Sequence, residues 1–269
     1  MTLTPREVVD RAVAEFAPVA IFVGFSGGRD SLAITHWMMN NVPGCKVFHV
    51  NTGIGIERTR EYVRETCAAQ GWPLTEIRAK EDCGQDYDEL VKERGFPGPD
   101  QHRKMYDRLK GRCVEKLVRD NKKFRSREKV MIASGVRRDE SKRRMGYGGR
   151  EINQVGAAQV WVNPIYHWTA DERDAYNRSH GIAVNPVSAM LGMSGECLCG
   201  AYAHKGEKAL VRLVCPQTAA RIDKLELEVL ARGFTWAWDA EPPRGGHNPK
   251  QGTMFMPMCV GCEKTAEAA

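Results

Sequence analysis

The segment AIFVGFSGGRDSLAITHWMM, residues 20–39, decides the fold of this chain. Its apolar beginning contains β-branched and aromatic residues, breaks at two glycines and continues with helical spacing, so it predicts a strand, a tight loop and a helix. Gly27 and Gly28 can adopt backbone angles closed to other residues and let N–H groups approach an anion. A helix that begins near Asp30 or Ser31 directs its free N–H groups and positive dipole end at the same point. The junction is therefore a candidate phosphate-binding loop.

Two side chains strengthen this interpretation of the loop. Arg29 carries a cation whose planar fork suits a phosphate, and Ser31 adds a hydroxyl. An ordinary glycine-rich turn is the alternative, but a cation and a hydroxyl directly after a strand favour phosphate binding. The pattern of a Walker A loop, Gly-x-x-x-x-Gly-Lys-Ser/Thr, occurs nowhere in the sequence.

Residues 26–31, Ser-Gly-Gly-Arg-Asp-Ser, resemble the Ser-Gly-Gly-Lys-Asp-Ser loop of the PP-loop ATP pyrophosphatases, whose fold relatives include the sulfonucleotide (PAPS) reductases. The resemblance implies that the chain binds ATP with Mg²⁺ and releases pyrophosphate, with Arg29 and Asp30 as catalytic residues. It also implies nucleotide contacts from the whole loop, namely Ser26, Gly27, Gly28, Arg29, Asp30 and Ser31. Arg29 departs from the usual lysine, which keeps the charge but replaces a point charge with a fixed fork.

Three further apolar runs predict strands, at residues 46–50, 130–134 and 160–165, and residues 74–78 are expected to form another. Strands and helices that alternate at this spacing imply right-handed parallel crossovers. We therefore expect an α/β fold with an open, twisted, mostly parallel sheet and helices on both faces. The resemblance identifies it as the Rossmann-like adenine nucleotide α-hydrolase type.

The end of the second predicted strand is a further candidate for nucleotide contact. Ligands of open α/β sheets bind at the carboxyl ends of the strands. Asn51, Thr52 and Gly53 follow that strand and are expected beside the nucleotide. Related proteins usually have Asp-Thr-Gly here, so Asn51 loses a charge and keeps a carbonyl acceptor.

The fourth predicted strand leads into a second basic motif. Residues 135–144 resemble the family's Gly-Ile/Leu-Arg-x-x-x-Ser-x-x-Arg. Gly135 permits a sharp exit from the strand, after which Arg137, Ser141 and Arg144 can face a phosphate or sulfate together. Arginines in such a cluster can hold an anion with paired hydrogen bonds and stabilise charge that develops in the transition state. An exposed basic loop is the alternative.

Other family motifs match in part. Residues 103–110 correspond to Arg-Trp-Cys-Thr-x-x-Leu-Lys; Leu109 and Lys110 fit, but Met105 stands where cysteine is common. Trp168-Thr169 and Asn185-Pro186 also match.

Cysteines form the second strong signal. Cys197 and Cys199 are separated by 59 intervening residues from Cys259 and Cys262. Thiolates spaced by one or two residues can bind a zinc ion or an iron–sulfur cluster, and a redox disulfide pair is a further alternative. The resemblance favours a 4Fe-4S cluster, because APS reductases and DNA phosphorothioation enzymes carry one on C-terminal cysteines. Cys215 is a substitute ligand.

The remaining cysteines differ in character from these pairs. They lie on or near amphipathic elements and are expected to be small buried apolar residues, namely Cys45, Cys67, Cys83 and Cys113.

Charge is concentrated in one stretch. Residues 103–150 contain eighteen Lys or Arg against six Asp or Glu, although the whole chain has a net charge of only +6. Such a block is typical of a surface that meets a phosphate-rich partner. The charge indicates a nucleic acid or a nucleotide with several phosphates and does not distinguish DNA from RNA; the resemblance to DNA phosphorothioation enzymes favours DNA. A solvated surface of basic helices is the alternative.

Composition sets the outer limits. The 269 residues suffice for one large domain with an appendage, and we expect residues 1–190 to form the nucleotide-binding domain and residues 191–269 a cysteine-rich helical extension. No apolar run approaches a membrane span, and the N-terminus lacks the apolar segment of a signal peptide. A cytoplasmic protein that does not contact membranes is therefore expected.

Three functions remain open at this level. The leading hypothesis is an ATP pyrophosphatase that adenylates an oxygen of a nucleic acid, favouring a DNA phosphate, so that sulfur from a donor such as a cysteine desulfurase can replace it. The second is a sulfonucleotide reductase that forms sulfite. The third is a nucleotide- and cluster-binding subunit without turnover, which the departures at Arg29 and Met105 make conceivable.

Overall fold

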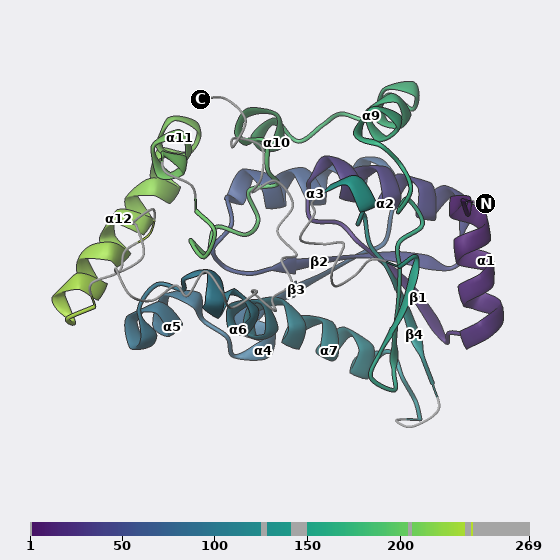
Figure 1. The fold of residues 1–269 in the computed structure, drawn as a ribbon, viewed down its shortest axis with the longest axis horizontal. Helices are drawn as coiled ribbons and strands as arrows, with labels where there is room; N and C mark the ends of the chain where they lie inside the picture. Colours follow the sequence, from purple (N-terminus) through teal and green to yellow (C-terminus); the bar gives the residue numbers. More distant parts are fainter. Residues whose placement is uncertain (1, 125–127, 141–149, 204–205, 235–237, 239–269) are drawn as a thin grey trace, which may run out of the picture.

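A six-stranded sheet with the order β3-β2-β1-β4-β6-β5 forms the centre of the computed structural model, which describes residues 2–124, 128–140, 150–203, 206–234 and 238 (Figure 1). The strands are β1 (Ala20–Gly24), β2 (Cys45–Asn51), β3 (Leu74–Arg78), β4 (Val130–Ala133), β5 (Ile152–Val155) and β6 (Gln159–Val162). Neighbouring strands are parallel except β5 and β6. The predicted open, mostly parallel sheet is thus confirmed, and its strand order reverses between β1 and β4, where such folds bind ligands.

Two details of the sheet differ from the sequence-based expectation. The antiparallel edge strand β5 was not predicted, because its sequence, Ile-Asn-Gln-Val, is half polar and lacks a clear apolar run. The strand expected over 160–165 ends at Val162, and a turn follows. Pro164 explains the early end, since proline has no N–H group to donate to a neighbouring strand.

Helices cover both faces of the sheet. One layer consists of α1 (Pro5–Phe16), α2 (Arg29–Asn41) and α3 (Glu57–Ala69). The other contains α4 (Ala79–Cys83), α5 (Tyr87–Arg94), the 3-10 turn η1 (Pro99–Gln101), α6 (His102–Tyr106), the π-helical turn η2 (Asp107–Gly111) and α7 (Arg112–Asp120).

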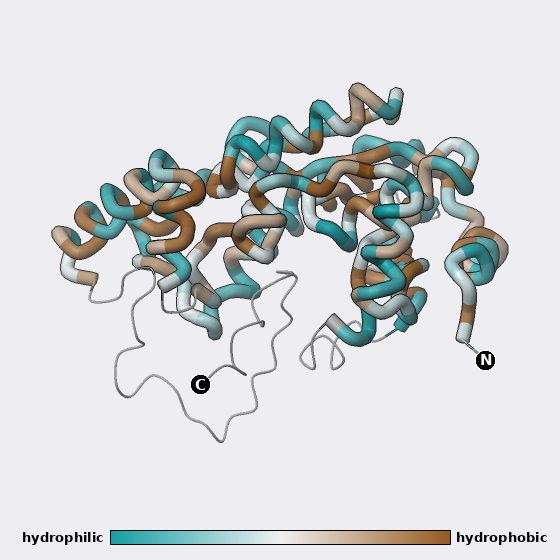
Figure 2. The backbone as a smooth tube through the Cα atoms, turned by 90° about the horizontal axis from the view of Figure 1, so that it is seen from above, coloured by the Kyte–Doolittle hydropathy of each residue, from teal (hydrophilic) through white to brown (hydrophobic). Residues whose placement is uncertain are grey.

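Each layer of helices packs against alternate side chains of the strands. Phe22 of β1 belongs to the core beneath α4–α7, while its neighbour Val23 belongs to the core beneath α1–α3. Brown and teal alternate along the helical coils in Figure 2, as expected for helices with one buried face.

Local side chains fix the starts of two helices. Thr4 caps α1, with Pro5 in its first turn, and its side chain is paired reciprocally with Glu7. The same capping box joins Thr169 and Glu172 at the start of α9 (Ala170–Ser179). Each box satisfies N–H groups that a helix leaves without partners at its N-terminus.

Three more helices follow, α10 (Pro186–Leu191), α11 (Glu207–Val214) and α12 (Pro216–Ala231). Ile222, Leu225 and Val229 of α12 belong to the same core cluster as strand residues Phe22 and Phe48. Helix α12, which follows residue 190, therefore shares packing with the sheet, and the boundary at residue 190 stays a prediction. Within the part of the chain that is described, no helix has both the length and the apolar character needed to cross a membrane.

Candidate functional site

The loop between β1 and α2 has the geometry of an anion cradle. Gly27 has a φ of +80°, and a Cβ atom there would lie 2.8 Å from Thr59 Cγ2. α2 begins at Arg29, one or two residues earlier than expected, and its first helical hydrogen bond runs from Leu32 N to Gly28 O at 2.9 Å. The N–H groups of the helix start precede that bond, so they remain directed at the loop.

Ser31 holds the loop in this shape. Its hydroxyl donates to Gly28 O at 2.9 Å and accepts from Ser26 N at 3.3 Å. The Ser26 and Ser31 hydroxyls are also 3.1 Å apart. The two serines at the ends of the motif are thus tied to each other across the glycines.

Asp30 is the most strongly bound carboxylate in the loop. It is 3% exposed, and its Oδ1 atom accepts from Arg137 Nε at 2.5 Å and from Arg173 Nη1 at 2.9 Å. Arg137 also donates from Nη1 to Trp168 O at 3.3 Å. Arg137 was expected to face a bound phosphate or sulfate, whereas its Nε atom donates to the carboxylate of Asp30.

Arg173 was not predicted as a site residue. It lies on α9, is 6% exposed, and also pairs with Asp174 at 2.9 Å. The only sequence signal for Arg173 was its place on the helix that follows the Trp168-Thr169 motif. Residue spacing alone does not show whether an arginine on that helix is buried or lies on the surface.

Arg29 lies on the outer side of the helix start. Its Nη1 atom is 3.8 Å from Asp174 Oδ2, and its carbonyl accepts from Asn177 Nδ2 at 3.2 Å. Arg29 and Gly27 are not among the residues that line the adjacent cavity. The loop therefore presents the cavity with Ser26, Gly28, Asp30 and Ser31.

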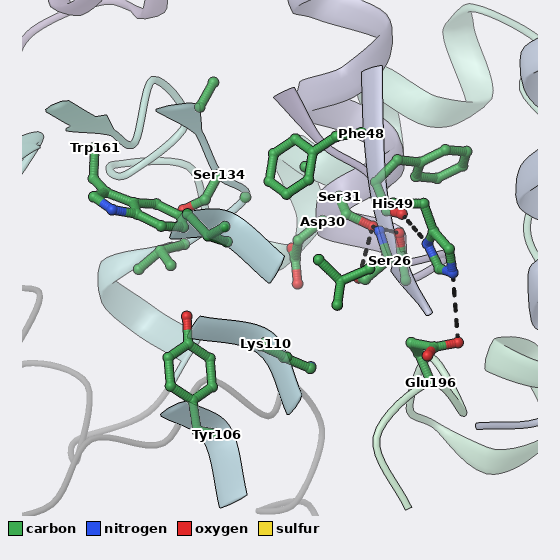
Figure 3. Close-up of a pocket in the computed structure, with 18 residues that line it drawn as sticks. Ser26, Asp30, Ser31, Phe48, His49, Tyr106, Lys110, Ser134, Trp161 and Glu196 are labelled. Carbon is green, nitrogen blue, oxygen red and sulfur yellow. Dashed lines mark hydrogen bonds and ion pairs between the residues drawn. The ribbon is translucent and has the colours of Figure 1, made fainter. Parts of the chain in front are cut away.

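This cavity lies at the carboxyl ends of β1, β2 and β4 (Figure 3). The helical segment opposite the loop contributes Tyr106 and Lys110, and Phe48 and Trp161 add aromatic walls. Gly135 also lines it, and a Cβ atom at that position would lie 2.7 Å from the backbone of Asp30. The exit of β4 thus approaches the start of α2 as closely as glycine permits.

The remaining residues of the second basic motif, Ser141 and Arg144, lie outside the described residues. Their expected contact with an anion stays a prediction.

The turn after β2 is occupied by contacts within the protein. Asn51 donates from Nδ2 to Glu76 at 2.9 Å and accepts from Gly53 N at 3.0 Å. A hydrogen bond from Arg64 lowers the pKa of Glu76 to about 2, so Glu76 stays an acceptor. Thr52 lines a second, smaller cavity rather than the one beside the loop.

Glu196 is buried at the border of the two cavities. Its carboxylate accepts from Thr52 N at 2.9 Å and from Arg60 Nε at 3.4 Å, and lies 3.6 Å from His49 Nε2. His49 donates from Nδ1 to Phe25 O at 2.7 Å. Burial alone would raise the pKa of Glu196, but His49, Arg60 and the Thr52 N–H group together hold it below its usual value.

Cys197 and Cys199 follow on the same loop and line the smaller cavity with Tyr106 and Lys110. A hydrogen bond with Cys197 and burial raise the pKa of the Cys199 thiol. Tyr87 donates to the Cys199 carbonyl at 2.8 Å, which fixes the loop from the other side. The sulfur atoms of the predicted pair are therefore brought together beside the loop site.

The other half of the predicted metal site, Cys259 and Cys262, lies outside the described residues. Over the described ranges, no group of three or more His, Cys, Asp or Glu residues is arranged to hold a metal ion. Cys197 and Cys199 fit a zinc or iron–sulfur site in donor type and proximity, because thiolates are the ligands of both.

The other cysteines are placed as follows. Cys215 contacts Thr218 Oγ1 at 3.0 Å at the start of α12 and does not line the smaller cavity. Cys45, Cys67 and Cys113 are buried and Cys83 is half-buried. Burial raises the pKa of both Cys45 and Cys67 to about 12, in keeping with small apolar residues.

Comparison with known proteins gives consistent similarities. The model of the phosphoadenosine phosphosulfate reductase domain matches residues 20–190. An adenosine 5'-phosphosulfate reductase of Mesorhizobium japonicum is 26% identical over 209 residues, covering 77% of this chain and 76% of the relative. An uncharacterised 37.8 kDa protein of Escherichia phage 186 is 27% identical over 256 residues, covering 78% and 75%.

One solved structure is similar in fold. The phosphoadenylyl-sulfate reductase of Candida auris, in a phosphate complex, superposes with a TM-score of 0.52 at 19% identity, covering 71% of this chain and 86% of that one. At this identity the similarity concerns the fold.

The first prediction concerns Asp30. Asp30→Asn keeps the shape of the side chain but removes the negative charge that Arg137 and Arg173 share. The free energy of unfolding should therefore fall by about 3 kcal/mol. Urea denaturation measures this change. Asp10→Asn, which removes an exposed pair with Arg6 at 3.8 Å, should change it by less than about 1 kcal/mol. Equal stability of the Asp30→Asn variant and the unaltered protein would contradict the role given to Asp30.

Proposed function

Because the chain belongs to the phosphoadenosine phosphosulfate reductase domain family, we propose that it binds ATP at residues 26–31, releases pyrophosphate and activates an oxygen of a nucleic acid for replacement by sulfur. The observation that carries the proposal is the loop itself. Gly28, the first turn of α2 with Asp30 and Ser31, and the hydroxyl of Ser26 tied to that of Ser31 all line one cavity. Such a convergence binds phosphate groups.

The proposed reaction has two steps. An oxygen of a nucleic-acid phosphate attacks the α-phosphorus of ATP, the bond to the β-phosphate breaks, and pyrophosphate leaves with Mg²⁺ neutralising its charge. Hydrosulfide then attacks the activated phosphorus and AMP leaves with the original oxygen. A sulfur donor such as a cysteine desulfurase would supply the hydrosulfide.

The residues around the loop have separate parts in this proposal. Lys110 lines the cavity and is the described cation best placed to meet phosphate charge there. Asp30 and Arg137 are bound to each other and orient the helix start. Tyr106, Phe48 and Trp161 provide apolar surface suited to a nucleotide base.

We propose that Cys197 and Cys199, with Cys259 and Cys262, hold a 4Fe-4S cluster, with zinc as the alternative. A cluster at these thiolates would bind or deliver sulfide. The support is the proximity of the first two sulfur atoms in a cavity that shares Tyr106 and Lys110 with the nucleotide cavity.

A sulfonucleotide reductase is the second candidate. It is favoured by the position of the Glu196-Cys197 pair at the border of the two cavities and by the reductases among the relatives. In that reaction a cysteine thiolate would attack the sulfur of the sulfonucleotide and the adenine nucleotide would leave. A dithiol such as reduced thioredoxin would then attack the cysteine sulfur, so that sulfite leaves and the dithiol is oxidised to a disulfide.

A matched pair of glycine variants tests ATP use. Gly27→Ala strains a positive φ and places a methyl group 2.8 Å from Thr59 Cγ2, so pyrophosphate release in the presence of DNA should fall at least tenfold. Gly44→Ala strains a φ of +76° with no atom within 4 Å, and should leave the rate within about twofold. Sulfite formation from PAPS or APS with thioredoxin, without pyrophosphate release from ATP, would favour the second candidate.

Metal binding has its own test. Cys197→Ser and Cys259→Ser should each lower the iron content and the visible absorption of anaerobically purified protein by more than half, because each removes one of four ligands. Cys67→Ser, at a buried cysteine in the opposite layer, should leave both unchanged. Colourless protein that contains zinc would replace the cluster with the alternative metal.

Contact with nucleic acid is proposed for one side of the helical segment 102–120. Lys104, Arg108 and Arg112 are four residues apart, which is about one helical turn each. They line a surface hollow to which Arg94 adds a further cation, and Asp107 and Glu115 add two carboxylates, so cations outnumber anions there. Arg108 donates to the neutral Gln85 at 3.4 Å rather than to a carboxylate. The row therefore keeps cationic groups available for successive phosphates.

A salt titration tests this surface. Joint replacement of Lys104, Arg108 and Arg112 by Gln should reduce the slope of log K against log salt for DNA binding by about 2 to 3. The control triple replaces Arg11, Lys46 and Arg178, which lie outside residues 103–150, and should leave the slope unchanged. Duplex DNA, single-stranded DNA and RNA serve as separate ligands. Equal loss of slope in both triples would remove the basis for a localised surface.

A further inference from the structure

We propose that Glu196 is a positioning residue, whose carboxylate fixes the loop with Cys197 and Cys199 at the carboxyl end of β2 and so sets where the two sulfur atoms stand relative to the nucleotide. The inference deepens the proposed function and rests on it for the chemistry of the sulfur atoms. The placement of the loop itself follows from contacts among described residues.

The first group of contacts joins Glu196 to the turn after β2. Its Oε1 atom accepts from both the N–H group and the hydroxyl of Thr52, at 2.9 and 3.0 Å, and its main-chain oxygen accepts from the same hydroxyl at 2.9 Å. Glu196 is 2% exposed. One residue of the strand end therefore binds both the side chain and the backbone of the residue that precedes Cys197.

A second group of contacts supports the charge of Glu196. Arg60 Nε donates to Oε2 at 3.4 Å, while Arg60 Nη2 donates to Gly55 O at 3.1 Å. His49 lies 3.6 Å from the same Oε2 atom and is anchored to Phe25, the residue before the phosphate loop. Glu196 is thus linked through His49 to the start of that loop, as the dashed lines in Figure 3 show.

The backbone around Glu196 is docked as well. Gly195 O accepts from Ile56 N at 2.8 Å, and Ser194 O accepts from the Thr59 hydroxyl at 2.6 Å. A Cβ atom on Gly55 would lie 2.7 Å from Glu196 Oε2 and 2.8 Å from its Cα atom. The fit therefore depends on glycine at position 55 and a carboxylate at position 196.

The two cavities explain why this position matters. Glu196 lines the nucleotide cavity, and its neighbour Cys197 lines the smaller one. Tyr106 and Lys110 line both. A shift of the loop would move the sulfur atoms away from Tyr106 and Lys110. The site of ATP-dependent activation and the site of sulfur transfer would then no longer be adjacent.

Two variants address the same contact from opposite sides. Glu196→Gln keeps one oxygen atom that can accept from Thr52 but removes the negative charge beside Arg60 and His49, and Gly55→Ala inserts a methyl group against Glu196. In each variant, alkylation of Cys197 and Cys199 in the full-length protein, followed residue by residue by mass spectrometry, should be at least fivefold faster. In the reaction, sulfur incorporation should fall at least tenfold more than pyrophosphate release.

Internal and external controls separate positioning from loss of structure. Cys45 and Cys67 are buried in the opposite layer, so their alkylation reports general unfolding and should not accelerate. Glu151→Gln removes another Glu–His pair, 2.7 Å from His167, at a residue that lines neither cavity, and should change neither measurement.

Different failures have different meanings. Unchanged alkylation of Cys197 and Cys199 in both variants, or equal acceleration at Cys45 and Cys67, overturns the positioning role while ATP binding still supports the proposed function. Absence of ATP binding by the unaltered protein overturns the proposed function and the part assigned to the sulfur atoms.

Discussion

A single buried carboxylate organises the candidate site. Asp30 belongs to the first turn of α2, Arg137 to the exit of β4 and Arg173 to α9, and the two guanidinium groups meet on one oxygen atom. Three segments distant in sequence are thereby joined behind the phosphate loop. Buried charges are tolerated only when they are paired, so each member of this group requires the others. The cost of separating them keeps the glycine backbone in one conformation.

Much of this arrangement follows from local sequence. The apolar runs predict β1, β2 and β4, because buried parallel strands have a largely apolar character. Thr4 and Thr169 predict helix starts through capping chemistry that depends on residues only three apart. The loop at residues 26–31 is likewise a local signal, since two glycines before a helix suffice to suggest an anion site.

Contacts between distant segments could not be read in the same way. Arg137 matched a motif and was expected to face a ligand, but its partner is 107 residues away in the chain. Glu196 was not predicted as a site residue, although Thr52, His49 and Arg60 all converge on it. Each of these pairings arises from the packing of loops at one edge of the sheet, which no periodicity in the sequence encodes.

The π-helical turn η2 offers a route by which the cavity lining could change in evolution. A π turn amounts to one extra residue within an α-helix, and here Arg112 N donates to Asp107 O. Excision of one residue from 107–111 would restore regular winding and rotate the preceding turn by about 100° relative to α7. Tyr106 would then leave the wall that the two cavities share, while the apolar side of α7 stayed in place. Deletion of a single codon could thus change the lining of both cavities during evolution and leave the hydrophobic core intact.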